Sequence, residues 1–249
     1  MYVVAIHGER TEDRAEPLAE ITGRALAEAR ARLRVPGTGP LVVAVLRDRA
    51  QAVDVGRRLK AAGFRVIAVG PEHVETDAAR IVARTATLTG ETLTVVPRQG
   101  EAVPVPLWTV TLLLFGTSAS VQTDVREEKS SKLSLGRAAL TGGLVSRKAV
   151  VRKVTTEEQI RERFVYLRAP GLPTVALREG SLQGAGEGEH ATRVGRFAQL
   201  MADLRRLCSA ARFDDRLLNR GTQAMLLGPA LAPEDHLDLV TTLLIRSLT

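Results

Sequence analysis

The residues best suited to chemistry in this sequence are the basic ones between Lys129 and Lys153. This segment holds seven lysines and arginines and no aspartate or glutamate, while the formal net charge of the whole chain is +7. A basic strip focused in this way attracts polyanions, whereas a diffuse surplus of charge mainly aids solubility. The candidate contacts with a polyanion or a partner are therefore Lys129, Lys132, Arg137, Arg147, Lys148, Arg152 and Lys153.

Functional and structural interpretations of this basic segment both stay open. Its charges could contact the phosphates of a nucleic acid or the headgroups of an anionic lipid. They could equally belong to a solvated loop that meets acidic patches in the same molecule or in a neighbour, which is the commoner role of a charge run. No aromatic residue interleaves with the charges, and this counts against stacking of single-stranded bases. We therefore expect no tight, sequence-specific binding of nucleic acid.

The remaining polar residues form no recognisable catalytic or metal-binding pattern. The histidines His7, His73, His190 and His236 lie in four separate segments, without the spacing of a metal site. The glycine-rich stretch at 184–188 is interpreted as a flexible loop, because its glutamates would repel a phosphate. The nucleophile motifs G-x-S-x-G and S-x-x-K are missing as well. We expect a protein that is not an enzyme and that has no cofactor and no metal.

Two further reactive residue types are interpreted as structural. Asp214 and Asp215 are adjacent and precede Arg216, and on a helix neighbouring side chains point about 100° apart. We therefore expect a helix start or a salt bridge there rather than an acid–base pair. Cys208 is the chain's only cysteine, which excludes an internal disulfide. It lies in an apolar run with helical periodicity, so we expect it in the core.

The composition is that of an ordinary globular chain. Hydrophobic residues make up 45% and charged residues 25%, while aromatic residues are only 3%, so leucine, valine and alanine must build the core. A length of 249 residues allows one large domain or two modest ones. No segment reaches the ~18 apolar residues of a membrane span, and no apolar leader follows a charged start. We expect a cytoplasmic protein with no membrane span.

The pattern over positions 1–71 predicts a small unit of strands and helices. The β-branched runs predict strands at residues 2–7, 41–46 and 64–69. Apolar spacing predicts two short helices within residues 16–34, joined at Thr22-Gly23, and one helix over residues 48–62 that Gly63 ends. The expected order of elements is βααβαβ, and we expect this unit to fold alone.

A set of packing positions in this unit follows the pattern TG-x-x-L-x-E-A-x-x-L, with one residue more before its last leucine, and, later, L-x-x-A-G. These positions are Thr22, Gly23, Leu26, Glu28, Ala29, Leu33, Leu59, Ala62 and Gly63. With this pattern the unit resembles the C-terminal domain of the bacterial ribosomal stalk protein. In that family the first helix engages translation GTPases through basic and apolar positions, where this chain has Glu16 and Glu20. The resemblance therefore implies the fold and not that activity.

Beyond Gly70-Pro71 the pattern predicts a second unit, residues 76–249, that is mostly antiparallel sheet. The expected strands are two around Gly90 within residues 85–97, one over 107–115, and a hairpin of 163–168 with 173–178. Residues 117–153 are expected to form a mobile basic insertion between strands. An amphipathic helix over residues 192–211 is expected to bury Phe197, Leu200, Leu204 and Leu207. A last helix is expected over residues 237–248.

Several strands followed by a packed helix is also the order found in pleckstrin-homology-like domains. The stretches FVYLR, PTVALRE, TRVGRFAQLMADLRRL and FDDRLL of this unit resemble a set of proteins expanded in myxobacteria. Those proteins share a stalk-like N-terminal unit, a strand-rich middle and this tail. The resemblance implies an architecture and no activity.

Taken together, these patterns predict an α+β fold in two domains, residues 1–71 and residues 76–249. The function we expect first is that of a non-enzymatic scaffold or adaptor that acts through protein–protein contacts, since a catalytic pattern is missing. One alternative is a factor associated with nucleic acid or an anionic surface through residues 129–153. A second alternative is an enzyme whose site is assembled from dispersed residues. The partner could also be a second copy of this chain, in a homo-oligomer.

Overall fold

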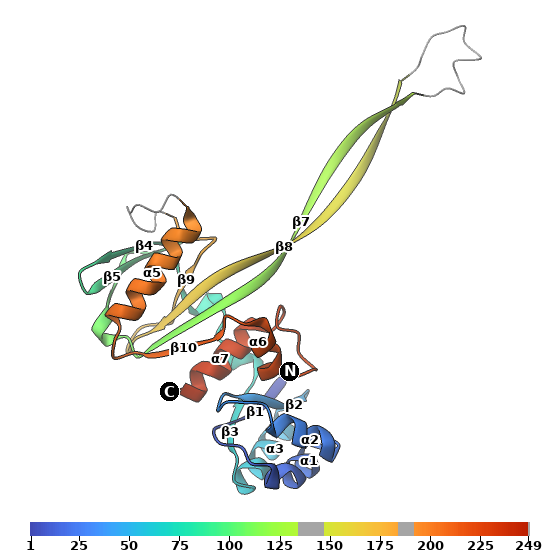
Figure 1. The fold of residues 1–249 in the computed structure, drawn as a ribbon, viewed down its shortest axis with the longest axis vertical. Coiled ribbons are helices and arrows are strands. Elements are labelled where there is room, and N and C mark those ends of the chain that lie inside the picture. The colour runs from blue at the N-terminus through green and yellow to red at the C-terminus, as the bar shows by residue number, and fades with distance from the viewer. Residues whose placement is uncertain (134–146, 184–191, 249) are drawn as a thin grey trace. The chain divides into compact units, whose positions relative to one another are not determined.

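The computed structural model describes residues 1–133, 147–183 and 192–248, and for residues 119–160 it describes the course of the backbone (Figure 1). The chain forms two compact units. The first is made of Met1–Ser118 with Glu162–Thr249, and the second is Ala119–Arg161. The expected α+β class is confirmed, with helices beside largely antiparallel sheets and a helix near the C-terminal end.

The first elements of the chain build a three-stranded antiparallel sheet with the strand order β2-β1-β3. Its strands are β1 (Tyr2–His7), β2 (Leu41–Leu46) and β3 (Arg65–Val69). Its helices are η1 (Glu12–Arg14), α1 (Ala15–Thr22), α2 (Leu26–Leu33) and α3 (Arg49–Ala61). The expected order βααβαβ is confirmed. Gly23, at φ 65°, ends α1 in the left-handed conformation that glycine adopts most easily, and this separates α1 from α2.

A seven-stranded sheet follows, with the strand order β10-β7-β8-β9-β4-β5-β6. Its strands are β4 (Ile81–Thr89), β5 (Thr92–Pro97), β6 (Val103–Pro106), β7 (Leu112–Leu133), β8 (Arg147–Arg168), β9 (Val175–Arg178) and β10 (Arg212–Leu217). The short 3-10 helices are η2 (Pro71–His73), η3 (Asp77–Ala79) and η4 (Leu107–Thr109). The later helices are α5 (Arg193–Leu207), α6 (Arg220–Leu227) and α7 (Leu237–Leu248). The sheet is mostly antiparallel, as expected, but β10 pairs with β7 and β9 with β4 in parallel.

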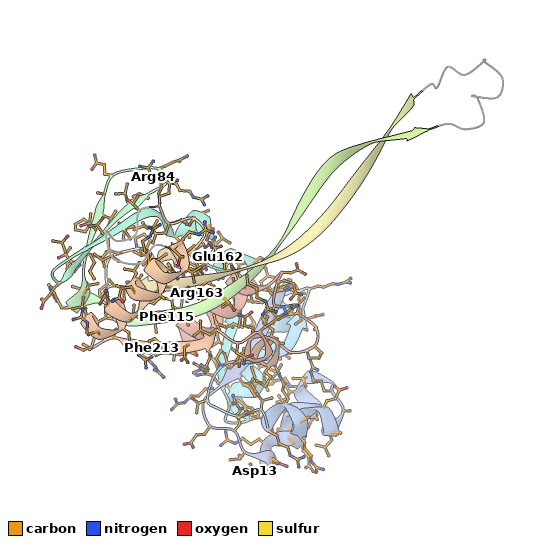
Figure 2. All side chains as sticks on the ribbon, turned by 45° about the horizontal axis from the view of Figure 1, so that its top comes forward. Asp13, Arg84, Phe115, Glu162, Arg163 and Phe213 are labelled. Carbon is orange, nitrogen blue, oxygen red and sulfur yellow. The ribbon has the colours of Figure 1, made fainter. Side chains whose placement is uncertain are left out.

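The central strands of this sheet are buried on both faces. Successive side chains of a strand point to opposite faces, and here they enter two different hydrophobic clusters. Leu112 and Leu114 of β7 join the cluster that contains the three-stranded sheet, while Leu113 and Phe115 join the cluster that contains α5. In the second cluster the Phe115 ring meets the Phe213 ring of β10, with centroids 4.8 Å apart (Figure 2). Burial on both faces explains why residues 112–115 of β7 and 164–167 of β8 are continuous apolar runs rather than alternating ones.

The long helix α5 forms where its spacing predicts it. The Thr192 hydroxyl accepts a hydrogen bond from the Gly195 amide at 3.1 Å and so satisfies one free donor of the first turn. Phe197, Leu200 and Leu204 are buried against the sheet, and Leu207 is partly buried. The predicted apolar face of this helix is thereby confirmed.

Three parts of the predicted second domain, residues 76–249, differ from the expectation. Residues 107–115 are not one strand: the Thr109 hydroxyl donates to the Pro106 carbonyl at 2.7 Å, which closes the turn η4 before β7 begins. Residues 117–133 and 147–153, expected as an insertion without regular structure, continue β7 and β8. Elements β10 and α6 were not foreseen, because their sequences show neither clear alternation nor a long apolar stripe. The predicted loop at 184–188 lies outside the described residues.

The expected division between residues 71 and 76 is not where the compact units separate. All four central residues of β1 and the first four of β2 are buried, so both faces of the three-stranded sheet are covered. Helices α1, α2 and α3 lie on one side of it, whereas α6 packs on β2 and α7 on β3 (Figure 1). The hydrophobic cluster accordingly runs from β1 into α7 and the seven-stranded sheet. The predicted N-terminal unit, Met1–Pro71, thus shares one core with the C-terminal helices.

Candidate functional site

The second compact unit, Ala119–Arg161, is a two-stranded ribbon, which is our name for this segment hereafter. Strands β7 and β8 are hydrogen-bonded neighbours. At their base the Thr111 amide donates to the Arg168 carbonyl at 2.8 Å and the Ser118 hydroxyl to the Glu162 carbonyl at 3.4 Å, which shows that the strands run in opposite directions. Their other neighbours, β10 and β9, pair only with residues 112–116 and 164–167. Within the part of the chain that the structure describes, the ribbon therefore has no third strand.

The predicted basic contacts map onto one half of this ribbon. Strand β7 carries Lys129 and Lys132, and strand β8 carries the positions Arg147, Lys148, Arg152 and Lys153. Because the two strands pair, these positions fall together in the half next to the connection 134–146. Asp124, Glu157 and Glu158 fall in the other half, whereas Glu127 and Glu128 directly precede Lys129 in the basic half, which still has a surplus of positive residues. Arg137 belongs to the connection and lies outside the described residues.

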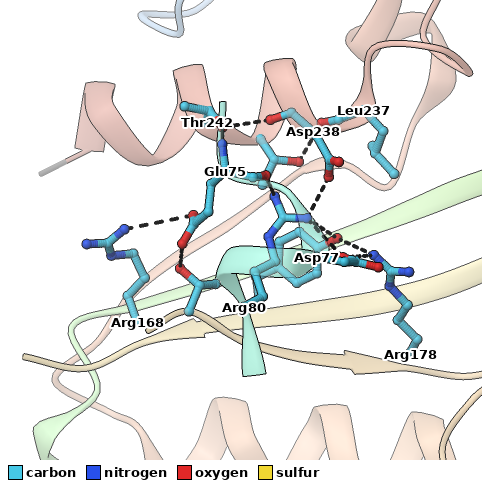
Figure 3. A network of polar contacts seen from close by, with 11 residues as sticks. Glu75, Asp77, Arg80, Arg168, Arg178, Leu237, Asp238 and Thr242 are labelled. Carbon is cyan, nitrogen blue, oxygen red and sulfur yellow. Dashed lines mark hydrogen bonds and ion pairs between the residues drawn. The ribbon is translucent and has the colours of Figure 1, made fainter. Parts of the chain in front are cut away.

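A buried polar network in the first unit centres on Arg80, whose side chain is fully buried (Figure 3). Its guanidinium donates to Asp238 at 2.5 Å and to Asp77 at 3.3 Å, and it lies over the Tyr166 ring at 4.5 Å. It also donates to the Glu75 carbonyl. Burial opposes the charge of Arg80, but the facing Tyr166, Asp238 and Glu75 outweigh it and raise the pKa. The guanidinium therefore stays charged.

The Arg80 network joins segments that are distant in sequence. The Glu75 amide donates to the Thr242 hydroxyl of α7 at 3.0 Å, and the Glu75 carboxylate accepts from Thr174 at 2.6 Å. Arg178 of β9 donates to Asp77 at 2.6 Å and to the Tyr166 hydroxyl at 3.2 Å. The network therefore holds the linker after β3 against β8, β9 and α7. We interpret its part as structural, since its charged groups are engaged with one another, although the buried Arg80 Nε has no acceptor among the described residues.

Replacing Arg80 with methionine should destabilise the protein by about 2–4 kcal/mol, since it leaves the partly solvated Asp238 without its cation and the Glu75 carbonyl without this donor, while Asp77 keeps its ion pair with Arg178. The matched control is Arg84→Met, which removes an exposed arginine of β4 (Figure 2) and should change stability by less than about 0.5 kcal/mol. Urea unfolding of both variants measures the difference. Equal stability of the two variants would show that the network contributes nothing to the fold.

A polar cavity of about 580 Å³ lies where β1, β3, β10 and the end of α7 meet. The side chains that line it include Arg14, Arg65, Arg212 and Arg216, with Glu9 as the acidic member. The cavity lies within the first unit, and its arginines come from three separate stretches of sequence. Spacing along the chain could not have brought these arginines together.

The arginines of this cavity are held in different ways. Arg14 donates to the Gly63 carbonyl at 2.7 Å, and Arg212 donates to the Leu248 carbonyl at 3.3 Å near the end of α7. Arg216 forms an ion pair with the buried Asp214 at 2.5 Å, so one of the two adjacent aspartates serves a salt bridge, as expected, but the pair lies in a strand and not at a helix start. The guanidinium of Arg65 makes no hydrogen bond to any residue within the described ranges.

The remaining reactive residues are dispersed. His7 lines the cavity, and partial burial together with the charge of Arg65 lowers its pKa, so the imidazole is neutral at pH 7. His73 lies beside Glu72, and the His236 ring contacts the Ala232 carbonyl at 3.0 Å. His190 lies outside the described residues. Among the described residues, no three histidines, cysteines or carboxylates gather closely enough to hold a metal ion.

The single cysteine behaves as a core residue. Cys208 is 3% exposed, in the cluster that contains α5, and burial raises its pKa to about 11. A thiol in this state is protonated at neutral pH and is a poor nucleophile. The expectation that Cys208 belongs to the core is confirmed.

Comparisons of this chain with protein-family models, with curated proteins and with solved structures found no match. Within the described ranges, no helix is both long and apolar enough to cross a membrane.

Proposed function

We propose that the protein is a non-enzymatic adaptor that binds another protein through the ribbon Ala119–Arg161. The observation that carries the proposal is that the ribbon forms its own compact unit with only two strands among the described residues. A two-stranded hairpin is marginally stable in water by itself, and its free edges are templates for a further strand. A partner that adds a strand to such an edge supplies hydrogen bonds and cover that the two strands lack, and this stabilises the ribbon.

The charges of the ribbon suggest the chemistry of that partner. The basic positions gather in the half next to the connection, so an acidic protein surface would be attracted and oriented by them. Lysines on free strand edges also discourage pairing between identical chains. We therefore favour an acidic protein over a second copy of the chain. The proposal includes a cytoplasmic location, which the sequence led us to expect.

A nucleic acid or an anionic lipid surface is the second candidate partner. It is favoured by the same basic positions, because phosphate groups are attracted to them without any need for sequence recognition. The resemblance of the segment Met1–Pro71 to the ribosomal stalk domain supports an interaction function without naming a partner. The alternative of an enzyme with dispersed residues draws support only from the polar cavity.

The test replaces five basic residues of the ribbon with serine, Lys129, Lys132, Arg137, Arg147 and Lys148. Chemical crosslinking in the native cell, followed by mass spectrometry, identifies the partner of the parent protein. The five-serine variant should lose that partner with little change in melting temperature, since surface charges typically contribute ~0–1 kcal/mol per pair. The matched control replaces five exposed arginines elsewhere, Arg30, Arg47, Arg49, Arg84 and Arg98, and should retain the partner.

Filter binding to DNA, RNA and anionic vesicles at two salt concentrations separates the two candidates. Affinity of the parent for a polyanion that falls steeply with salt and disappears in the five-serine variant would favour the second candidate. If the five-serine variant keeps both the protein partner and any polyanion affinity, the ribbon's basic half is not the contact, and the proposal fails.

A further inference from the structure

The arginine-lined cavity carries more positive charge than its surroundings compensate. Four arginines line it, and among the described residues Glu9 is the carboxylate in its lining, while Asp214 lies next to Arg216. Asp214 is already paired with Arg216. Arg14 and Arg212 donate to backbone carbonyls, which carry no formal charge. Like charges gathered in one concave space repel one another unless an anion joins them.

The geometry of the cavity suits an oxyanion. Arg14 and Arg212 each use one guanidinium nitrogen on a carbonyl, which fixes the side chain while other N–H groups keep no acceptor within the described ranges. Arg65 has all of its guanidinium donors available there. Guanidinium groups match the oxygen spacing of phosphate and bind it through paired hydrogen bonds. The supports are rigid, because Arg65 begins β3, Arg212 begins β10 and Arg14 ends η1.

We propose that this cavity binds a small phosphorylated molecule, whose phosphoryl oxygens are held by Arg14, Arg65 and Arg212. A volume of about 580 Å³ falls within the range of small-molecule sites, roughly 300–1,000 Å³. Glu9 at the cavity opposes a bare anion but can accept hydrogen bonds from hydroxyl groups elsewhere on the ligand. The ligand class is therefore a phosphate ester with hydroxyl groups.

The binding test is calorimetry on the full chain, with inorganic diphosphate and ADP as probes at low ionic strength. Both probes should bind the parent, because both present adjacent phosphoryl groups. The double variant Arg65→Gln with Arg212→Gln should weaken both at least tenfold. Glu9→Gln should strengthen the binding of inorganic diphosphate, since it removes a negative charge that no described cation of the cavity pairs with. A variant that merely damaged the fold would not produce this gain.

Two control proteins keep the test specific. The double variant Arg47→Gln with Arg84→Gln removes the same charge from exposed positions outside the cavity and should change affinity less than twofold. The five-serine ribbon variant should bind as the parent does. The proposal is overturned if the parent binds neither probe. It is also overturned if either control loses binding as the cavity variant does, because the charge would then act from elsewhere.

Discussion

Residues 1–71 expressed alone should show no cooperative unfolding transition. The fragment contains β1, β2, β3 and the helices that cover one face of their sheet, but it lacks α6 and α7, which pack on β2 and β3. Without them, one face of β2, which is apolar throughout, and of β3, which is apolar from Val66 to Val69, is exposed to water. Each large apolar side chain that loses its cover forfeits roughly 1.5–3 kcal/mol, and two or three of them exceed what so small a unit has in reserve.

Polar contacts are lost from the same fragment. Arg32 of α2 donates to the Leu226 carbonyl of α6 at 2.8 Å, and Arg246 of α7 donates to the Ala68 carbonyl of β3 at 3.4 Å. Burial lowers the pKa of Arg32 to about 10, with the charges of Arg24 and Arg10 as further causes. Circular dichroism during urea titration and binding of a hydrophobic dye measure the outcome. A sharp transition without dye binding would show that the fragment Met1–Pro71 holds a sufficient core of its own.

Most of the individual helices and strands of this fold can be predicted from the sequence. The runs at 2–7 and 41–46, the break at Gly23 and the stripe of Phe197, Leu200 and Leu204 each depend on neighbours within a few residues. Periodicity and turn chemistry report such neighbours directly. The structure has these strands, this helix break and this helix at the predicted positions.

That residues 1–71 share a hydrophobic core with the C-terminal helices was harder to predict, although one feature of the sequence indicated it. The run LVVAVL at Leu41–Leu46 is apolar at every position, and its first four residues are fully covered. A strand with such a run needs cover on both faces. The segment Met1–Pro71 supplies helices for one face, so the second cover had to come from elsewhere in the chain. Sequence alone does not say which distant helix supplies it.

The ribbon and the cavity escaped prediction for physical reasons. A strand is recognised from the alternation that one buried face imposes, and residues 119–133 are mostly polar, so the pairing of β7 with β8 leaves little trace in the pattern. The cavity joins Arg14, Arg65 and Arg212 through tertiary packing only. The positions singled out for their charge were expected in a mobile insertion between strands, whereas those that the structure describes belong to β7 and β8.

Excising the ribbon should abolish partner binding and leave the first unit folded. Replacing Ala119–Arg161 with Asn-Gly joins Ser118 to Glu162, which already lie opposite each other across β7 and β8. A two-residue loop of this type matches the twist of an antiparallel pair. Both hydrophobic clusters hold together side chains from residues 1–118 and 162–248, and we expect this core to survive the change. We therefore expect the excision to change partner binding strongly and the stability of the first unit only slightly.

The most direct measurement is to compare the melting curve of the excised protein, and its affinity for the partner found by crosslinking, with those of the parent. We predict one cooperative transition near that of the parent and no detectable partner binding. Retained binding by the excised protein would contradict the account, because the contact would then lie on the first unit. Loss of the transition would contradict it equally, since the ribbon would then be part of the fold rather than an element for contact.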